Sequence, residues 1–273
     1  IGLLHAAADG VKFFFKEDFV PPKADKLLFA LAPILSMIPV LGLLGVIPMG
    51  DTLCLNKVTA VEAGKTVFLY ASHTGMCQQF IAVKGGGVQM NAVDLAISPL
   101  NVGILYVFAM AGQGIVGAAI AGWSSDNKFS LMGALRAASQ MVSYEVAIGL
   151  SLVGAMMVYG TVRLDDMVRW QGDNAWGIFV QPLAFILFFV ASIAENKRIP
   201  FDLPEAESEL VSGYFTEYSG MKFGMFYFAE YMEIVTGSML LVTIFLGGWQ
   251  LPFFHRDGIT VELRATQGSA ENL

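Results

Sequence analysis

The sequence predicts an all-α polytopic membrane protein, on the evidence of its composition and its apolar runs. Of the 273 residues, 55% are hydrophobic and 14% are charged, and the mean hydropathy is +0.61. Soluble domains carry about 25% charged residues, so this composition is typical of a membrane protein. A helix needs roughly 20 apolar residues to cross a hydrocarbon core of about 30 Å. Five runs reach that length, at 27–49, 98–122, 141–160, 177–194 and 223–247.

The segment before the first run, 1–26, is predicted to be amphipathic and to lie at the membrane surface. Asp9, Lys12 and Lys16 punctuate a stretch that contains three consecutive phenylalanines. Charged residues interleaved with aromatic ones are typical of surface segments. Apolar walls with a few charged groups would also suit a hydrophobic ligand that carries polar carbonyls. A plain surface anchor is the alternative.

The connection 51–93 is expected to be an extended external loop, and 250–273 a polar tail. Cys54 and Cys77 lie in this connection without a CxxC pattern, which argues against a zinc or iron–sulfur site. The three histidines lie outside the apolar runs, so no span offers an axial ligand to a haem. We therefore expect the chain to bind no metal and no redox cofactor of its own. The pairing of the two cysteines stays open.

The second apolar run carries small residues at four-residue spacing: Gly114, Ala118 and Gly122. Small side chains allow two membrane helices to approach closely. The pattern predicts ordinary bundle packing and carries no catalytic meaning.

Three glutamates lie inside apolar runs. Glu145 is in the third run, and Glu230 and Glu233 are three residues apart in the fifth. A charged side chain at bilayer depth costs about 2.5–3.5 kcal/mol on insertion scales, so such residues indicate function. The alternative is that they snorkel from helix ends. Arg136 does not neutralise Glu145, because nine helical residues turn the chain by about 900° and place the two on opposite faces.

The connection 195–222 is predicted to be an acidic loop on the same side as residues 1–26. Pro204 can begin a helix, which would place Glu205 and Glu209 on one face. Repulsion between such carboxylates raises pKa values, so the loop could exchange protons near neutral pH. A solvated acidic loop is the alternative. Its carboxylates are Glu195, Asp202, Glu205, Glu207, Glu209 and Glu217.

Net charge and its distribution bear on partners and orientation. The net charge is −7 and no basic stripe is present, which excludes a nucleic-acid partner. The side that holds residues 1–26 and 195–222 carries slightly more Lys and Arg, so the positive-inside rule makes it cytoplasmic. We expect residues 1–273 to form a single membrane-embedded domain.

Three stretches resemble a known family: DGVKFFFKED, LRAASQMVSYEVAIG and, above all, IPFDLPEAESELVSGYFTEYSGMKF. They are similar to the quinone-chamber membrane subunit of respiratory complex I. This family comprises the H-type subunit in bacteria and the first membrane-encoded subunit in mitochondria. The resemblance covers nearly the whole chain, except residues near 51–93 and those after Trp249.

The resemblance implies an eight-helix fold within an NADH:quinone oxidoreductase, a proton translocase. Quinone would be the substrate, and flavin and iron–sulfur clusters would reside in partner subunits of the peripheral arm. The proton-relay residues that the motifs imply are Glu145, Glu205, Glu207, Glu209, Glu217 and Glu230. The quinone-chamber residues that they imply are Asp9, Lys12, Arg136, Arg198, Phe201 and Asp202.

The sequence departs from the family pattern in three places. The family's first span and last two spans are missing, and the 51–93 connection is longer than expected. The expected location is a bacterial inner membrane, in preference to the mitochondrial one, with other complex subunits and lipid as partners. Two alternatives are the homologous subunit of an energy-converting hydrogenase or ferredoxin- or F420-linked complex, and a proton or sodium secondary transporter. The transporter class predicts inverted repeats, and the sequence halves show none.

Overall fold

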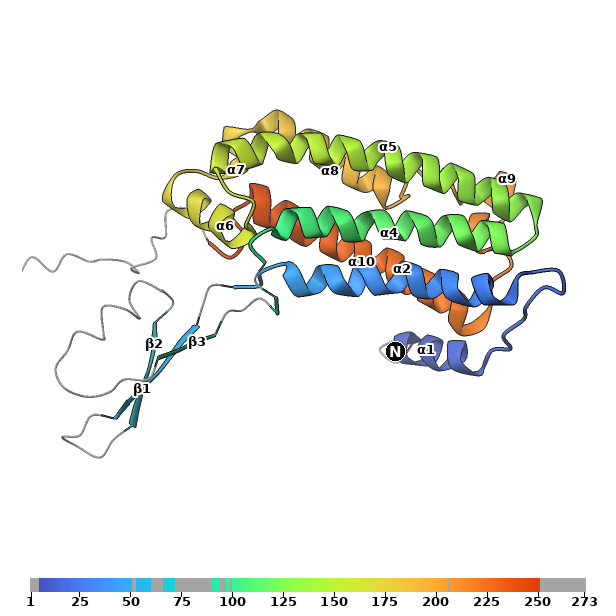
Figure 1. The fold of residues 1–273 in the computed structure, drawn as a ribbon, viewed down its shortest axis with the longest axis horizontal. Helices are drawn as coiled ribbons and strands as arrows, with labels where there is room; N and C mark the ends of the chain where they lie inside the picture. Colours follow the sequence, from blue (N-terminus) through green and yellow to red (C-terminus); the bar gives the residue numbers. More distant parts are fainter. Residues whose placement is uncertain are drawn as a thin grey trace, which may run out of the picture.

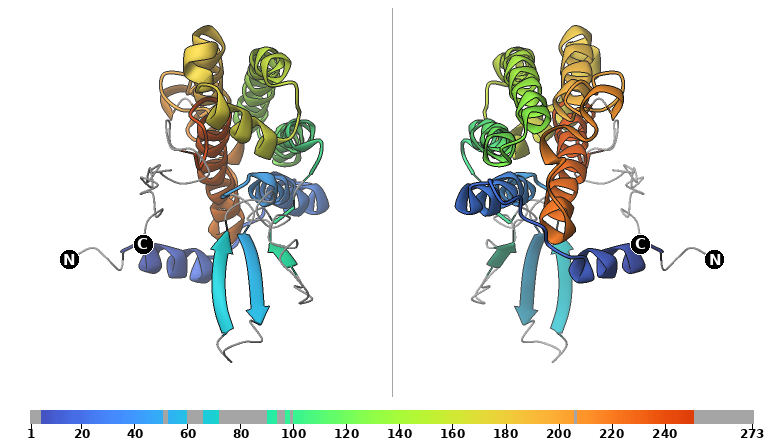
Figure 2. Two further views of the ribbon diagram at one scale, coloured as in Figure 1. Left: turned by 90° about the vertical axis from the view of Figure 1, so that its left-hand side faces the viewer. Right: turned by 90° about the vertical axis from the view of Figure 1, so that its right-hand side faces the viewer.

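The computed structural model describes residues 5–50, 53–59, 66–71, 90–93, 97–98, 100–205 and 207–250. Long helices lie side by side in a bundle (Figure 1), and Figure 2 shows this bundle from its two ends. The bundle helices are α2 (Lys26–Val46), α4 (Gly103–Ser124), α5 (Lys128–Tyr159), α8 (Pro182–Glu195) and α10 (Gly220–Phe245). The other helices are α1 (His5–Phe15), α6 (Leu164–Asp173), α7 (Gly177–Val180), α9 (Glu207–Leu210) and the 3-10 turn η2 (Gly213–Phe215).

In the described part of the chain, four helices are long and apolar enough to cross a membrane: α2, α4, α5 and α10. The fourth predicted span, 177–194, consists of two shorter pieces, α7 and the apolar 14-residue α8. The break falls where Pro182 lacks a backbone N–H and starts α8. Gln181 secures the break by donating from Nε2 to the Gly154 carbonyl of α5 at 2.8 Å. The predicted class, an all-α polytopic membrane protein, is confirmed.

Helix α5 is longer than the sequence pattern predicted. The third predicted span was expected to begin near residue 141, whereas the helix begins at Lys128. Asn127 caps the helix by accepting from the Phe129 N–H, and Gly160 ends it in the left-handed region at φ 68°. At 1.5 Å per residue, 32 residues extend for about 48 Å, which exceeds the hydrocarbon core. One end of α5 therefore projects beyond the apolar layer.

The connection expected to be an extended loop contains a small antiparallel sheet. Its strands are β1 (Leu53–Thr59), β2 (Thr66–Ala71) and β3 (Met90–Val93), in the order β2-β1-β3. The sheet lies beyond the end of the bundle where α6 is found (Figure 1). The side chain of Cys54 and all of Cys77 fall outside the described residues, so their pairing stays a question.

Small residues bring the bundle helices together, as the sequence predicted. A methyl group added at Gly122 of α4 would overlap the Cβ of Ala134 on α5. Ala118 is 2% exposed and belongs to the apolar cluster at this end of the bundle. In that cluster Phe29 of α2 stacks on Tyr218 with ring centroids 4.0 Å apart.

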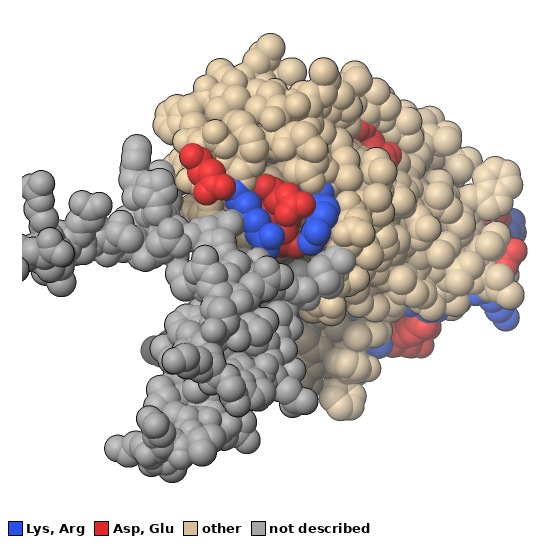
Figure 3. All heavy atoms as spheres, turned by 60° about the vertical axis from the view of Figure 1, so that its left-hand side comes forward, with Lys and Arg blue, Asp and Glu red and all other residues tan. Residues whose placement is uncertain are grey.

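At the end of the bundle opposite to this apolar cluster, α6 lies across the ends of the helices. Gln171, 2% exposed, accepts from the backbone N–H groups of Gly177 and Gly247, each at 3.1 Å. Its Nε2 donates to the Thr243 carbonyl at 2.9 Å. Figure 3 shows a small group of charged side chains on this face, with further charged side chains apart from it. Helix α6 carries ion pairs here, with Asp166 3.6 Å from Arg163.

The acidic loop predicted at 195–222, called the acidic segment from here on, has a shorter helix than the sequence predicted. The helix described there begins at Glu207 and is four residues long, whereas Pro204 and Glu205 lie in a turn before it. Glu205 and Glu209 therefore do not share a helix face. The missing turn has a physical reason: Pro204 is fully buried, and its carbonyl packs against Gly213, so tertiary contacts fix the backbone here.

Candidate functional site

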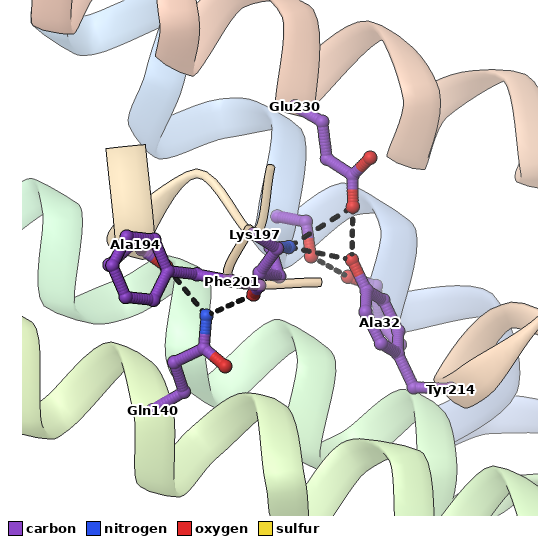
Figure 4. A network of polar contacts seen from close by, with 8 residues as sticks. Ala32, Gln140, Ala194, Lys197, Phe201, Tyr214 and Glu230 are labelled. Atoms are coloured by element: carbon purple, nitrogen blue, oxygen red, sulfur yellow. Dashed lines mark hydrogen bonds and ion pairs between the residues drawn. The ribbon is translucent and has the colours of Figure 1, made fainter. Parts of the chain in front are cut away.

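A closed triangle of polar contacts lies inside the bundle where the acidic segment meets α10 (Figure 4). Glu230 Oε1 accepts from Lys197 Nζ at 3.1 Å and from the Tyr214 hydroxyl at 2.7 Å. Lys197 Nζ also donates to Tyr214 Oη at 2.9 Å. All three residues are buried, with exposed fractions of 5%, 4% and 2% for Glu230, Lys197 and Tyr214. Burying two charges is tolerated only when they pair and their hydrogen bonds are satisfied, as they are here.

Lys197 reaches this position because the chain turns sharply after α8. Its backbone adopts the left-handed region at φ 54°, which non-glycine residues seldom occupy. Gln140 of α5 fixes the turn: its Nε2 donates to the carbonyls of Ala194 and Phe201, both at 2.7 Å (Figure 4). Strain held by surrounding contacts is typical of functional segments.

Two cavities connect further carboxylates to the triangle. A cavity of about 10 Å³ is lined by Glu230, Lys197 and Glu233, among others. A second, of about 70 Å³, is lined by Glu233 and by Glu195 of α8, and it touches all five bundle helices. A water molecule needs roughly 10–15 Å³ of such space, so the first cavity is close to one water in size and the second can hold several. Glu233 borders both cavities.

Glu145 lies on α5 and faces the backbone of α4. A methyl group added at Gly112 would lie 3.2 Å from Glu145 Oε1, so the absence of a side chain at Gly112 gives this carboxylate its room. Glu195 interacts electrostatically with both Glu233 and Glu145. Together with Glu205 of the acidic segment, which interacts with Glu230, these glutamates form a series of neighbours. We call these five residues the carboxylate row. The row consists of Glu205, Glu230, Glu233, Glu195 and Glu145.

Glu205 is the member of the row in the acidic segment. Burial, followed by the neighbouring charges of Glu230 and Asp202, raises its pKa to about 7. Lys197 and Arg198 act in the opposite direction. The sequence predicted raised pKa values in this segment from repulsion along a helix face, whereas the cause at Glu205 is chiefly burial.

Other residues predicted from the sequence lie apart from the row. Glu209 is exposed and pairs with Arg136 of α5 at 2.8 Å. Glu217 accepts a hydrogen bond from Asn127, at the start of α5. The side chains of Glu207 and Asp9 fall outside the described residues, although both residues lie in helices.

The residues predicted to wall a ligand chamber come from three segments: α1, α5 with Arg136, and the acidic segment. Phe201 meets the ring of Tyr144, next to Glu145, edge-on at 5.6 Å, and Arg198 lies 4.9 Å from the Tyr231 ring. Asp202 is half-buried in the same turn. Lys12 on α1 lines a surface hollow of about 300 Å³ against Phe223 of α10.

The amphipathic first segment packs against the start of α10. Ser219 accepts from the Phe19 N–H at 3.0 Å and donates to the Glu17 carbonyl at 3.0 Å. Lys222 pairs with Asp18 at 2.9 Å. The segment 1–26 and the acidic segment therefore meet at the same end of the bundle, as the sequence predicted.

Sequence reasoning did not assign roles to Lys197, Tyr214 or Gln140. Their partners lie 33, 16 and 54–61 residues away in the chain, so no local pattern could reveal them. The one available signal was a lysine directly after an apolar run, between Glu195 and a proline-rich stretch.

Fold and site together define a class: a polytopic helical membrane subunit with a row of carboxylates, one buried and the others half-buried, that runs inward from an acidic segment at one end of the bundle. A family model described as NADH dehydrogenase matches residues 1–267. The chain belongs to this family, and the resemblance predicted from the sequence, to a complex I membrane subunit, is confirmed.

Curated relatives are similar over most of the chain. An NADH-quinone oxidoreductase H-type subunit of Geobacter metallireducens is 46% identical over 253 residues, which cover 93% of this chain and 67% of that protein. The corresponding protein of Geobacter sulfurreducens is 46% identical, with 93% and 66% covered. That of Thermomicrobium roseum is 42% identical, with 94% and 68% covered. The chain spans about two thirds of the length of these relatives.

Proposed function

We propose that this chain is a membrane subunit of a proton-pumping NADH:quinone oxidoreductase, forms part of its quinone-binding chamber, and relays protonation changes through buried glutamates to the pumping subunits. The observation that carries the proposal is the carboxylate row. It begins at Glu205 in the acidic segment, passes Glu230 and Glu233, and reaches Glu195 and Glu145 within the bundle. Acidic residues at membrane depth are costly and mark proton pathways.

Chamber residues are proposed at the end of the bundle where the row begins. Phe201 and Arg198 contact aromatic rings there, and Lys12 lies on α1, which packs on α10. Apolar walls with a few cations suit a ring that carries carbonyl groups, which is the chemistry of a quinone. Other subunits of the complex complete the chamber and carry the flavin and iron–sulfur clusters, and the chain itself holds no cofactor.

Reduction of quinone changes the charge in the chamber. Glu205, with a pKa of about 7, responds to such a change near neutral pH by taking up or releasing a proton. Water in the two cavities bridges the carboxyl groups beyond it, since direct transfer needs hydrogen-bond distances. We place the chain in the inner membrane of a bacterium, with the acidic segment on the cytoplasmic side.

Substitution of Glu145 tests the relay. In the full-length chain within the assembled complex, Glu145→Gln removes the titrating group at the inner end of the row but keeps its shape. We expect most of the proton pumping, measured with a pH-sensitive dye in membrane vesicles, to be lost. Asp173→Asn, an exposed carboxylate on α6, is the matched control and should pump normally. Normal pumping by an assembled Glu145→Gln complex would refute the relay.

The names of the relatives favour the quinone-linked branch over a hydrogenase-type complex, since each is an NADH-quinone oxidoreductase subunit. Identification of the soluble subunits that co-purify with the chain tests this point. A flavin-containing NADH-oxidising arm is expected, and a hydrogenase arm would contradict it.

A further inference from the structure

The proposed proton relay gives no role to the buried charge of Lys197. Lys197 carries an ammonium group into the bundle interior, yet an ammonium cannot accept a proton from a glutamic acid while it remains charged. Burial, the largest single effect, would lower the pKa of Lys197, but Glu230, Tyr214 and Glu233 together outweigh it, and the pKa lies well above its usual value. The ammonium therefore stays charged throughout the working pH range.

Two hydrogen-bond donors converge on the carboxylate of Glu230. Both donors of the triangle, Lys197 Nζ and the Tyr214 hydroxyl, point at the same oxygen, Oε1. Burial and the charge of Glu230 raise the pKa of Tyr214 well above its usual value, so its hydroxyl keeps its proton and acts as a donor. A carboxylate that accepts hydrogen bonds from a cation and a hydroxyl is stabilised as the anion.

We propose, on the basis of the relay above, that Lys197 is a positioning residue that keeps Glu230 as a fixed anion. Glu205 and Glu233, on either side of Glu230, then take up and release the mobile proton. The Lys197–Glu230 pair has no net charge, so it neither repels a proton strongly nor retains it. Without the ammonium, Glu230 would bind the proton itself and interrupt the row.

The surroundings of Glu230 fit this assignment. The small cavity beside it is lined by Ser36 of α2, Gly114 of α4 and Met141 of α5, which do not titrate near neutral pH. Ionisable and charged groups face it from the remaining elements. They are Lys197 after α8, Tyr214 of η2, Glu205 with its neighbours Asp202 and Arg198 in the acidic segment, and Glu233 and Tyr227 on α10 itself.

The test is the pH profile of NADH:quinone reductase activity in vesicles that contain the assembled complex with the full-length chain. Lys197→Met removes the charge but retains the length of the side chain. We expect the acid limb of the profile to move to higher pH by about one unit, which is a tenfold rise in proton affinity. Lys197→Arg keeps the cation and should leave the limb close to its original position. Adding Glu230→Gln to Lys197→Met should abolish the shift.

Tyr214→Phe provides a second variant, because it removes one donor to Glu230 and leaves the lysine in place. A smaller shift in the same direction is expected. An unmoved acid limb in Lys197→Met, or an equal shift in Lys197→Arg, overturns the proposal. If Lys197→Met fails to assemble, an unmoved limb in Tyr214→Phe overturns it. The readout is separate from that of Glu145→Gln: loss of the relay appears in pumping, and loss of the fixed anion appears in the pH profile.

Discussion

At the scale of single residues, burial distinguishes the carboxylates of the acidic segment from one another. Glu205 and Glu209 are four positions apart, but the turn at Pro204 sends Glu205 inward and leaves Glu209 exposed beside Arg136. The pKa of Glu205 rises from 4.5 to about 7, chiefly through burial. A carboxyl with a raised pKa binds its proton more tightly in the folded state, so stability falls as pH rises from about 4.5 through about 7.

Glu205→Gln removes this pH-dependent cost. We expect the melting temperature of the variant complex, relative to the parent, to be higher at pH 8 than at pH 5, because only the parent must ionise a half-buried carboxyl. Thermal unfolding in detergent at both values measures the difference. Glu209→Gln in the same segment is the control and should show no comparable trend. Parallel melting curves for Glu205→Gln and the parent would contradict the assignment.

At the scale of helices, packing depends on places where a side chain is missing. Gly122 lets α4 touch α5 at Ala134 and at the Ser130 carbonyl, and Gly112 leaves space for the Glu145 carboxylate. The small residues that the sequence places along α4 therefore determine where α4 contacts α5.

Gly122→Ala should push α4 and α5 apart, since the added methyl would overlap Ala134. Overpacking of this kind costs about 1–3 kcal/mol, and thermal inactivation of the assembled complex should therefore occur at a lower temperature. Gly149→Ala on α5 is the matched control: its added methyl would meet Phe108 at 3.8 Å, an ordinary contact. Equal stability of the two variants would show that the close approach does not limit packing.

The sequence was sufficient for those features that depend on local pattern. The lengths of the apolar runs predicted the spans. The free-energy cost of a charged side chain in lipid indicated that Glu145 and Glu230 have a functional role. The sequence could not predict where α5 begins, because residues 128–140 mix polar and apolar side chains. This part of the helix is in contact with η2 and α9. Nor could the sequence predict the partner of Glu230, since Lys197 meets it only after α8 and α10 have packed.

At the scale of the whole molecule, the two ends of the bundle differ in the kind of contacts they contain. The end with the acidic segment carries the row and its ionisable groups, whereas at the α6 end Gln171 makes neutral hydrogen bonds, in addition to the ion pairs of α6 with Arg163. Gln171 satisfies two backbone N–H groups and one carbonyl from α7 and the end of α10. No charged side chain takes part in these three contacts.

Gln171→Leu should loosen the α6 end, because it leaves three buried backbone groups without their partner. Each such group costs about 1–3 kcal/mol. We expect less assembled complex and faster proteolysis near 160–176, with no change in the pH profile of the complex that remains. Asp173→Asn on the same helix is the control. A shifted pH profile would instead show that the two ends are coupled.

The clamp that Gln140 forms across residues 194–201 has a mechanical consequence. One amide group holds both ends of the turn, so the turn cannot slide along α5 unless two short hydrogen bonds break together. Glu195 and Lys197 lie inside this ring of bonds, so the turn that carries them is fastened to α5. A displacement of the acidic segment would therefore be passed to α5 through these two bonds, with Glu195 and Lys197 carried along together.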